Sequence, residues 1–463
     1  MSVHFKIANF NFFSKGQLYM LLNFAHLDLN EKGMLYIKLY EEIKSAVSNG
    51  ILKKGERLPS VREAATQLGV SRTTVENAYT KLCIEGIIES KPQKGYFVIG
   101  IPQITPNTSL SPTPKTIITY DFSSRSVDSE NSDTELWKKL VRSVLWDSGE
   151  LNSYGDPQGE LGLRKALSDY SYKARGVTTT AENIIVGAGV GPLLNILCGL
   201  LGRKIKVGFE RDFKEAQQIF DSYGIENFAL DTDKNGVTEE SLTKNQPDVL
   251  FLLPSSLSKI SPTSISVRRN FIRDWAKKND CLIIEDDYNG ELRYTARSVP
   301  AFQQKSPQNT IYIGSFSKLL LPSVRIAYMV LPDFLAKKLH NGSYIYNQTC
   351  GKIEQLALEK YIVTGALEKH LKRLRRVYYN KSQLLINELK RNFNNIKSIS
   401  LFESSLTIEI EFLQDINEDI TKTLLENGVK IANIKNLNTI SLCFSGIPLE
   451  KIPDGIKWLK KFL

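Results

Sequence analysis

Cysteine and histidine are scarce in this chain, which has 5 of the former and 4 of the latter among 463 residues. The cysteines stand singly, with no CxxC pair and no histidine nearby, so a zinc ribbon is excluded and no metal site is expected. A disulfide scaffold is disfavoured too, and five buried thiols suit the reducing cytoplasm. Because none of the four histidines lies in a recognisable motif, a serine or cysteine hydrolase is not expected.

Charge-free runs that are apolar and long enough to resemble a membrane span are nearly absent as well. The exception is Ile184–Gly202, which contains five glycines and a proline, so we predict a strand, a glycine turn and a buried helix rather than a membrane span. The apolar patch Leu18–Leu22 is interrupted by an asparagine with no cleavage site after it, which argues against a secretory signal. Residues 1–32 match no recognisable pattern, and Met20 or Met34 are alternative starting points.

The remaining composition is that of a folded protein, with 42% hydrophobic and 24% charged residues. A length of 463 residues favours two to four domains. Lys and Arg outnumber Asp and Glu by 60 to 50, so the net charge of +10 permits, without demanding, a polyanionic partner.

A proline-rich segment divides the chain into two unlike regions. Residues 100–118 carry prolines at 102, 106, 112 and 114 among Ser, Thr and Asn, a composition typical of a semi-rigid linker. We therefore predict a small domain over residues 33–99 and a large one over residues 119–463.

The small region has the pattern of a winged helix-turn-helix. A helix is predicted over residues 35–49, and Ser60 with Glu63 has the spacing of a capping box at the start of a second helix that ends at Gly69. Ser71 caps a third helix, and the short strands Ile87–Glu89 and Tyr96–Val98 flank a turn at residues 92–95. Such a third helix is able to enter a DNA major groove.

Polar side chains gather where DNA would lie, with Arg72, Thr73 and Thr74 at the start of the third helix and Lys94 in the wing turn. The alternative is a solvated helical hairpin that contacts protein, which charge alone does not reject. The stretch Gly55–Val75, GERLPSVREAATQLGVSRTTV, resembles the signature of GntR-type bacterial regulators. This resemblance and the position of the third helix and wing together give the expected DNA-contacting residues: Arg57, Ser60, Arg62, Ser71, Arg72, Thr73, Thr74, Lys94 and Gly95.

The most informative run of the large region is Ser-Phe-Ser-Lys, which follows the predicted strand Ile311–Ile313 and ends in Lys318. A lysine at the mouth of a sheet is able to form a Schiff base, the internal aldimine, with pyridoxal 5'-phosphate. Ser315, Ser317 and Arg325 are then placed to hold its phosphate, before a next strand at residues 326–330. The alternative for Lys318 is a surface lysine after a strand.

Two upstream segments favour the cofactor. Residues 281–288, CLIIEDDY, read as a buried parallel strand that ends in acids, so Asp286 is the candidate partner for the pyridine nitrogen and Tyr288 for the phenolate oxygen. Asp287 is then expected to be solvated or to cap a helix. The strand and glycine-rich turn at residues 184–191 offer the backbone amides of Gly189 and Val190 to a phosphate.

With Tyr154-Gly155-Asp156-Pro157-Gln158-Gly159, these pieces resemble the fold-type-I aminotransferase domain of the MocR (GabR-like) branch of GntR regulators, over residues 34–463. The resemblance implies an α/β PLP-dependent transferase fold with large and small subdomains, a homodimer, and Lys318 as the Schiff-base lysine. It also implies that Asp286, Tyr288, Ser315, Ser317, Arg325, Gly189, Val190 and Tyr154 bind the cofactor.

The sequence departs from that family where a substrate carboxylate is bound. The family's arginine strand reads here as Ser441-Leu442-Cys443-Phe444, no arginine follows Arg391, and Glu215 stands where some members carry another arginine. Losing an arginine that binds a carboxylate through two hydrogen bonds weakens carboxylate binding ten- to a hundredfold, roughly 1.5–3 kcal/mol. At most residual transaminase activity is expected, and the signal is predicted to be pyridoxal phosphate itself or a ligand other than an ordinary amino acid. The alternatives are an active aminotransferase with a DNA-binding appendage, or a regulator whose large domain no longer binds cofactor.

Overall fold

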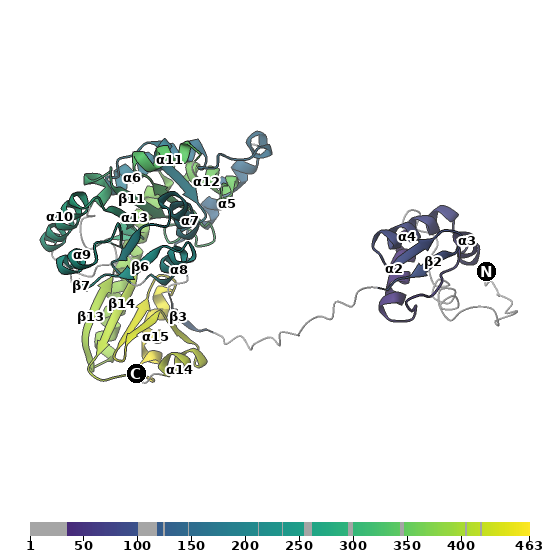
Figure 1. Ribbon diagram of the computed structural model, residues 1–463. Helices are drawn as coiled ribbons and strands as arrows, with labels where there is room; N and C mark the ends of the chain where they lie inside the picture. Colours follow the sequence, from purple (N-terminus) through teal and green to yellow (C-terminus); the bar gives the residue numbers. More distant parts are fainter. Residues whose placement is uncertain are drawn as a thin grey trace. The chain divides into compact units, whose positions relative to one another are not determined.

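The computed structural model describes residues 35–100, 118–123, 126–146, 148–211, 213–233, 235–253, 262–294, 300–342, 347–402, 405–416 and 419–463. The chain divides into two compact units, residues 1–114 and 115–463, which we call the small unit and the large unit (Figure 1). The predicted N-terminal extension and nearly all of the proline-rich segment lie outside the described residues. Across the ranges given above, no helix is both long and apolar enough to cross a membrane.

In its described part, residues 35–100, the small unit contains three helices and a hairpin. Helices α2 (Leu35–Ser48), α3 (Val61–Leu68) and α4 (Arg72–Ile84) precede strands β1 (Ile88–Lys91) and β2 (Gly95–Val98). The strands pair antiparallel from Ile88 with Val98 to Lys91 with Gly95, so the hairpin is longer than predicted. One apolar core, which includes Leu39, Val75 and Tyr79, packs the three helices together.

The predicted helix boundaries of the small unit are confirmed by their caps. Ser60 and Glu63 form the reciprocal capping box, in which the Glu63 amide donates to Ser60 Oγ and the Ser60 amide donates to the Glu63 carboxylate. Gly69 ends α3 in the left-handed region at φ 66°, where a side chain would be strained. Ser71 caps α4 by accepting from the Thr74 amide at 3.1 Å. Local hydrogen bonds thus fix the turn between the two helices.

The large unit centres on a mixed sheet of seven strands among the described residues, in the order β4-β12-β11-β10-β9-β5-β6. Neighbouring strands run parallel from β11 to β6, whereas β12 is antiparallel to both β11 and β4. The strands are β4 (Ile184–Gly187), β5 (Lys206–Phe209), β6 (Glu226–Ala229), β9 (Val249–Leu252), β10 (Leu282–Asp286), β11 (Thr310–Ser315) and β12 (Ala327–Val330). Because β10, β11 and β9 are parallel, the segments that follow them leave from one edge of the sheet.

Helices cover both faces of this sheet, as expected for a parallel arrangement. One apolar core joins Val186 and Tyr312 to Leu163, Leu358 and other residues of α6, α12 and α13. A second core joins Ile185 and Ile313 to residues of α7 and α8. The helices of the sheet layers are α5 (Thr134–Trp146), α6 (Leu161–Arg175), α7 (Val190–Leu201), α8 (Lys214–Ser222), α9 (Glu239–Asn245), α10 (Pro262–Lys278), α11 (Asp333–His340), α12 (Lys352–Val363) and α13 (Ala366–Asn392). The charge-free stretch at residues 184–202 thus forms β4, a turn and α7, as predicted.

The C-terminal part of the large unit forms a small subdomain, drawn in yellow-green in Figure 1. Strands β13 (Ile396–Phe402), β14 (Thr407–Phe412), β17 (Thr439–Cys443) and β16 (Asn433–Asn436) pair antiparallel in that order. Strand β3 (Tyr120–Phe122), at the start of the large unit, pairs in parallel with β15 (Val429–Ile431). The remaining elements are α14 (Ile420–Glu426), α15 (Ile452–Leu459), β7 (Thr232–Asp233), β8 (Gly236–Val237) and the 3-10 turns η2 (Ser148–Asn152), η3 (Ala181–Asn183), η5 (Gly290–Leu292), η6 (Phe302–Lys305) and η7 (Leu449–Lys451).

Candidate functional site

The predicted DNA-contacting residues of the small unit lie at its surface. Arg57, Arg62, Ser71, Arg72, Thr73 and Lys94 are exposed, and Ser60, Thr74 and Gly95 are half-buried. They come from the segment before α3, from the first turns of α3 and α4, and from the wing. Of the exposed cations, Arg72 lies at the N-terminal end of α4, the end that helix-turn-helix proteins present to base edges.

The wing and the first loop are joined through Arg57. This residue forms an isolated bridge with Phe97, and a Cβ at Gly95 would meet the Arg57 Nε at 3.3 Å. Gly95 also has φ +102°, a conformation that side chains rarely adopt. Glycine at this position therefore lets the Arg57 guanidinium lie along the hairpin beside the exposed Lys94.

Lys318 lies in a buried position of the large unit, just beyond the end of β11. Its side chain is 6% exposed, and its Nζ donates to the Ser126 carbonyl at 3.0 Å and to Ser445 Oγ at 3.3 Å. Burial lowers the pKa of the Lys318 amine. A lowered pKa favours the neutral amine that attack on a carbonyl requires. Because Lys318 is buried, the surface-lysine alternative is wrong.

Asp286 ends strand β10 and pairs in register with Ile313 of β11. Its side chain is 3% exposed, and its Oδ1 has no hydrogen-bond partner. Burial, with a smaller contribution from the Asp287 charge, raises the pKa of Asp286 to about 7. A buried carboxyl oxygen without a partner is costly unless a ligand supplies one, and a protonated ring nitrogen is such a donor.

The expectation for Asp287 is wrong, since this residue neither faces solvent nor caps a helix. It is 1% exposed and forms an ion pair with the buried Arg175 at the end of α6. Arg175 Nη2 donates to its Oδ1 at 3.1 Å, and the Tyr312 hydroxyl donates to its Oδ2 at 2.9 Å. Sequence gave no sign of this pair because its partners are 112 residues apart.

The predicted phosphate cradle has the geometry of an anion site. Gly189 caps α7 with φ 102° and without a side-chain cap, and a Cβ there would meet the Arg325 guanidinium at 2.6 Å. Arg325 itself has φ 49°, a strained backbone for a residue that is not glycine. Val190 opens α7, and the Ser317 amide donates to Ser315 Oγ at 3.3 Å. An uncapped helix N-terminus beside an arginine and two serines fits a phosphate.

The two predicted tyrosines are placed differently. Tyr288 lies two residues after Asp286 and is half-buried. Burial raises the pKa of its hydroxyl to about 12, which keeps it a hydrogen-bond donor. Tyr154 is fully exposed, so the fold of one chain does not bring it among the buried groups around Lys318.

Sequence reasoning missed a buried pair that supports this site. Lys381 is 1% exposed, forms an ion pair with Asp128 at 2.7 Å, and donates to the carbonyls of Ser445 and Ile447. It thereby ties α13 to the two segments that supply the acceptors for Lys318. The available signal was its spacing, because Lys381 occupies a core position of α13 between the buried Tyr378 and Leu385.

Ser441, which we predicted from the sequence to stand in place of the family's carboxylate-binding arginine, lies on β17. Ser441 is 5% exposed, and its Oγ has no hydrogen-bond partner. Glu215 is exposed on α8. A buried amine, a buried carboxyl oxygen without a partner and an arginine beside a helix N-terminus are thus present and fit pyridoxal phosphate. When bound, pyridoxal phosphate supplies an aldehyde for a lysine amine and a ring that withdraws electrons.

Comparisons with known proteins agree with this architecture. The family model described as bacterial regulatory proteins of the gntR family matches residues 35–98, and that of aminotransferase class I and II matches residues 119–435. The HTH-type transcriptional regulator YdeL of Bacillus subtilis is 34% identical over 92% of this chain and 96% of its own length.

Two further regulators and one solved structure extend the comparison. The pyridoxine biosynthesis regulator PdxR of Corynebacterium glutamicum is 30% identical over 78% of this chain and 80% of its own length. The probable rhizopine catabolism regulator MocR of Rhizobium meliloti is 27% identical over 85% of each chain. The crystal structure of an archaeal alanine:glyoxylate aminotransferase matches 74% of this chain and 90% of its own, with 21% identity and a TM-score of 0.65, and so shares the fold of the large unit.

Proposed function

Since the chain belongs to the helix-turn-helix transcriptional regulators that join a GntR-type domain to an aminotransferase class I and II domain, the MocR type, we propose that it regulates transcription in response to pyridoxal phosphate. In this proposal the small unit binds DNA and the large unit binds the cofactor. The observation that carries it is the contrast between Asp286, whose buried Oδ1 has no partner, and Ser441, which stands in place of the arginine.

DNA binding is supported by the surface of the small unit. The N-terminal turn of α4 presents Arg72 and Thr73, both exposed, and the wing presents Lys94. In this role α4 enters the major groove while Arg57, Arg62 and Lys94 contact phosphates. A homodimer places two such units on two half-sites of one operator.

Cofactor binding is supported by residues from several segments of the large unit. Asp286 at the end of β10 would pair with the ring nitrogen, Tyr288 would donate to the phenolate oxygen, and Arg325 with Gly189 would hold the phosphate. Lys318 then provides the amine. Tyr154, exposed in one chain, would join the site of the second copy in a homodimer.

The absence of a carboxylate-binding arginine supports pyridoxal phosphate as the effector rather than as the coenzyme of a transamination reaction. A guanidinium fork holds a carboxylate through two parallel charge-assisted bonds, and the Ser441 hydroxyl replaces neither the charge nor the second bond. The name of the relative PdxR, a pyridoxine biosynthesis regulator, supports a link with this vitamin. An active aminotransferase is the competing function, and sustained amino-group transfer in a panel of amino donors would establish it.

The test uses the full chain, freed of cofactor, and a DNA duplex selected with it from random sequence. We expect pyridoxal phosphate to change the affinity for this duplex by about 5- to 150-fold, the usual range of coupling between two sites. Lys318→Ala is expected to abolish the response, and Lys337→Ala, at an exposed lysine of α11, to leave it intact. An affinity that stays constant through saturation with pyridoxal phosphate would contradict the proposal.

A second measurement tests the site itself. Borohydride reduction of the cofactor-loaded chain, followed by peptide mapping, is expected to place the pyridoxyl label on Lys318. A label on other lysines, or on none, would contradict the proposed cofactor site. It would favour the alternative that the large unit serves only for dimerisation.

A further inference from the structure

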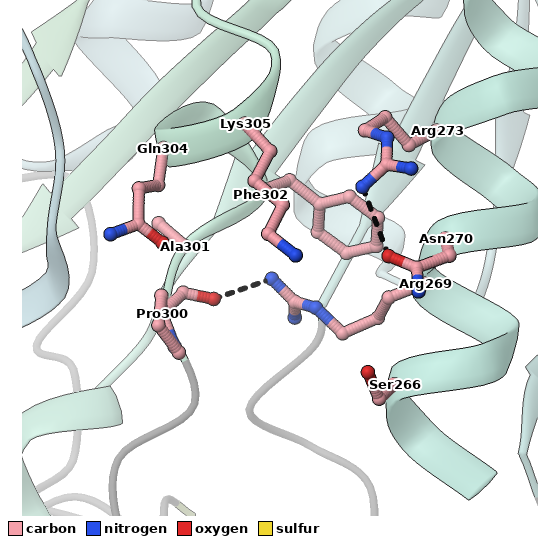
Figure 2. A pocket seen from close by; sticks show the side chains of 9 residues that line it. All are labelled: Ser266, Arg269, Asn270, Arg273, Pro300, Ala301, Phe302, Gln304 and Lys305. Carbon is pink, nitrogen blue, oxygen red and sulfur yellow. Dashed lines mark hydrogen bonds between the residues drawn. The ribbon is translucent and has the colours of Figure 1, made fainter. Parts of the chain in front are cut away.

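A cavity of the large unit lies apart from the residues assigned to the cofactor. It has a volume of about 130 Å³ and is lined by α10 and by the segment that includes η6. Figure 2 shows three cationic side chains in its wall, Arg269 and Arg273 of α10 and Lys305 of η6. By volume it has room for about four water molecules, enough for a small anion with a short substituent.

The cavity follows one face of α10. Ser266, Arg269, Asn270 and Arg273 are spaced i, i+3, i+4 and i+7, so their side chains emerge on the same side of the helix. The opposite wall includes the Phe302 ring, and the Arg269 guanidinium lies over it at 3.8 Å from the ring centroid. Stacking holds the guanidinium in a fixed orientation.

Positive charge exceeds negative charge in this wall. Arg269 reaches Glu285 only at 3.4 Å and donates to the Pro300 carbonyl at 2.8 Å. Glu285 already accepts from the backbone amides of Phe302 at 2.9 Å and Gln303 at 3.2 Å. Glu285 therefore divides its two oxygens between Arg269 and two backbone amides.

Of the other two cations, Arg273 is paired through both Nε and Nη2 with Asp274 at the surface. Arg273 also donates to Asn270 Oδ1 at 2.9 Å, and the Asp274 side chain is 67% exposed. Lys305 forms no hydrogen bond or ion pair with any residue of the described ranges, and in Figure 2 its ammonium points toward the Arg269 guanidinium. Two like charges that face each other across a cavity repel unless an anion lies between them.

We propose that this cavity binds the phosphate group of a small phosphorylated metabolite. The guanidinium of Arg273, the ammonium of Lys305 and the free edge of the Arg269 fork surround the anion, with Ser266 and Asn270 as neutral donors. Phosphate suits this set because it has oxygen acceptors in several directions, whereas a carboxylate presents two oxygens in one plane.

The cavity is separate from the cofactor's own phosphate site. Glu285, which contacts the cavity arginine, and Asp286, which is assigned to the cofactor, are successive residues of β10, so their side chains point to opposite faces of the sheet. The proposal shares no residue with the Lys318 site and does not depend on the proposed function. It identifies a second chemical input to the same large unit.

The test is calorimetric titration of the full, cofactor-saturated chain with inorganic phosphate at low ionic strength, with acetate as the carboxylate control. The double variant Arg273→Ala/Lys305→Ala is compared with Lys277→Ala/Lys278→Ala, which removes the same charge from exposed positions of α10. We expect the second variant to bind phosphate like the parent and the first to bind at least tenfold more weakly. Lys305→Ala alone, at an exposed position, provides a folded variant if the double substitution disturbs packing.

Three results would overturn the proposal. They are no saturable phosphate binding to the parent chain, equal loss in both double variants, and equal affinity for acetate. A DNA duplex that displaces the bound phosphate, with displacement lost in Arg273→Ala/Lys305→Ala, would also overturn it by assigning the cavity to the DNA backbone.

Discussion

The two units place their functional side chains in opposite ways. In the small unit the cations that would meet DNA are exposed, and the hydroxyls among them bond to groups three residues away, as Ser60 does with Glu63. In the large unit Lys318, Asp286 and Lys381 are buried, and Lys318 bonds to residues 192 and 127 positions away in the chain. Substitutions in the first unit should therefore alter binding or one helix cap, whereas those in the second alter binding and the free energy of unfolding together.

The largest effect that would sharpen this comparison is expected from Asp286→Asn. Burial raises the pKa of Asp286 from 3.8 to about 7, so between these pH values the folded chain without cofactor holds a proton that the unfolded chain releases. The bound proton therefore stabilises the folded chain fully below pH 3.8, the pKa of Asp286 in the unfolded chain. This stabilisation is lost as the pH rises through about 7, the pKa of Asp286 in the folded chain.

Asp286→Asn cannot titrate, so without cofactor it should be more stable than the parent above pH 7, by at most on the order of 4 kcal/mol. It should also bind pyridoxal phosphate about ten- to a hundredfold more weakly, because a neutral amide does not pair with a ring cation. Urea unfolding at pH 5 and pH 8 and a cofactor titration measure the two effects. Parallel pH profiles for the two proteins would show that another group titrates.

Arg72→Ala tests the exposed side of the comparison. Loss of one arginine contact at the start of α4 should cost about 1–3 kcal/mol of DNA-binding free energy, with no change in cofactor binding. A gel-shift or anisotropy titration with the selected duplex measures it. Lys81→Ala is the control, since Lys81 lies in the last turn of the same helix with its Nζ over the Tyr40 ring at 4.1 Å. Equal losses in the two variants would indicate a general charge effect.

Ser60→Ala separates a cap from a DNA contact. Removing the hydroxyl that accepts from the Glu63 amide should destabilise the small unit by about 1 kcal/mol. Ser48→Ala removes an exposed hydroxyl that donates to the Lys44 carbonyl at 2.8 Å, and it should change stability by less than about 0.5 kcal/mol. Chemical unfolding monitored in the small unit provides the measurement, and identical midpoints for both variants would exclude a capping role.

Ser441→Ala should have the smallest effect on stability, and unlike Ser60→Ala it should not destabilise the protein. Its Oγ is buried without a partner, so removing the hydroxyl should leave stability unchanged or raise it by up to about 1 kcal/mol. Thermal unfolding of the cofactor-loaded chain measures the change. A clear loss of stability would mean that the hydroxyl is bonded in solution, and Ser445→Ala, which removes a donor to the Ser126 carbonyl at 2.6 Å, provides the contrasting loss.

The difference between the units also explains how far the sequence could be interpreted. The helices and caps of the small unit were predictable because each cap joins residues three positions apart. In the large unit the positions of Lys318, Asp286 and Gly189 followed from strands that end at one edge of a sheet. Its fold was predictable through the family resemblance, since strand order depends on contacts between distant segments.

The environment of Lys318 was not predictable for the same reason. Ser126, Ser445 and Lys381 lie in segments with no motif, and only folding brings them together. Asp287 was misjudged because adjacent acids at a strand end usually include one that faces water, whereas here Arg175 provides a buried partner. A lysine at a core position of α13 was the one visible sign of buried charge.

The carbonyl of Ser126 accepts from two donors, the amine of Lys318 and the hydroxyl of Ser445, at 3.0 and 2.6 Å. Ser126 follows closely on β3, the first strand after the proline-rich segment, and Asp128 beyond it is tied to α13 through Lys381. If the Lys318 nitrogen forms a covalent bond with a ligand, it has fewer N–H groups, and its hydrogen bond to the Ser126 carbonyl is weakened or lost. The hydrogen bonds that hold Ser126 at the start of the large unit therefore depend on whether the Lys318 amine is free to donate.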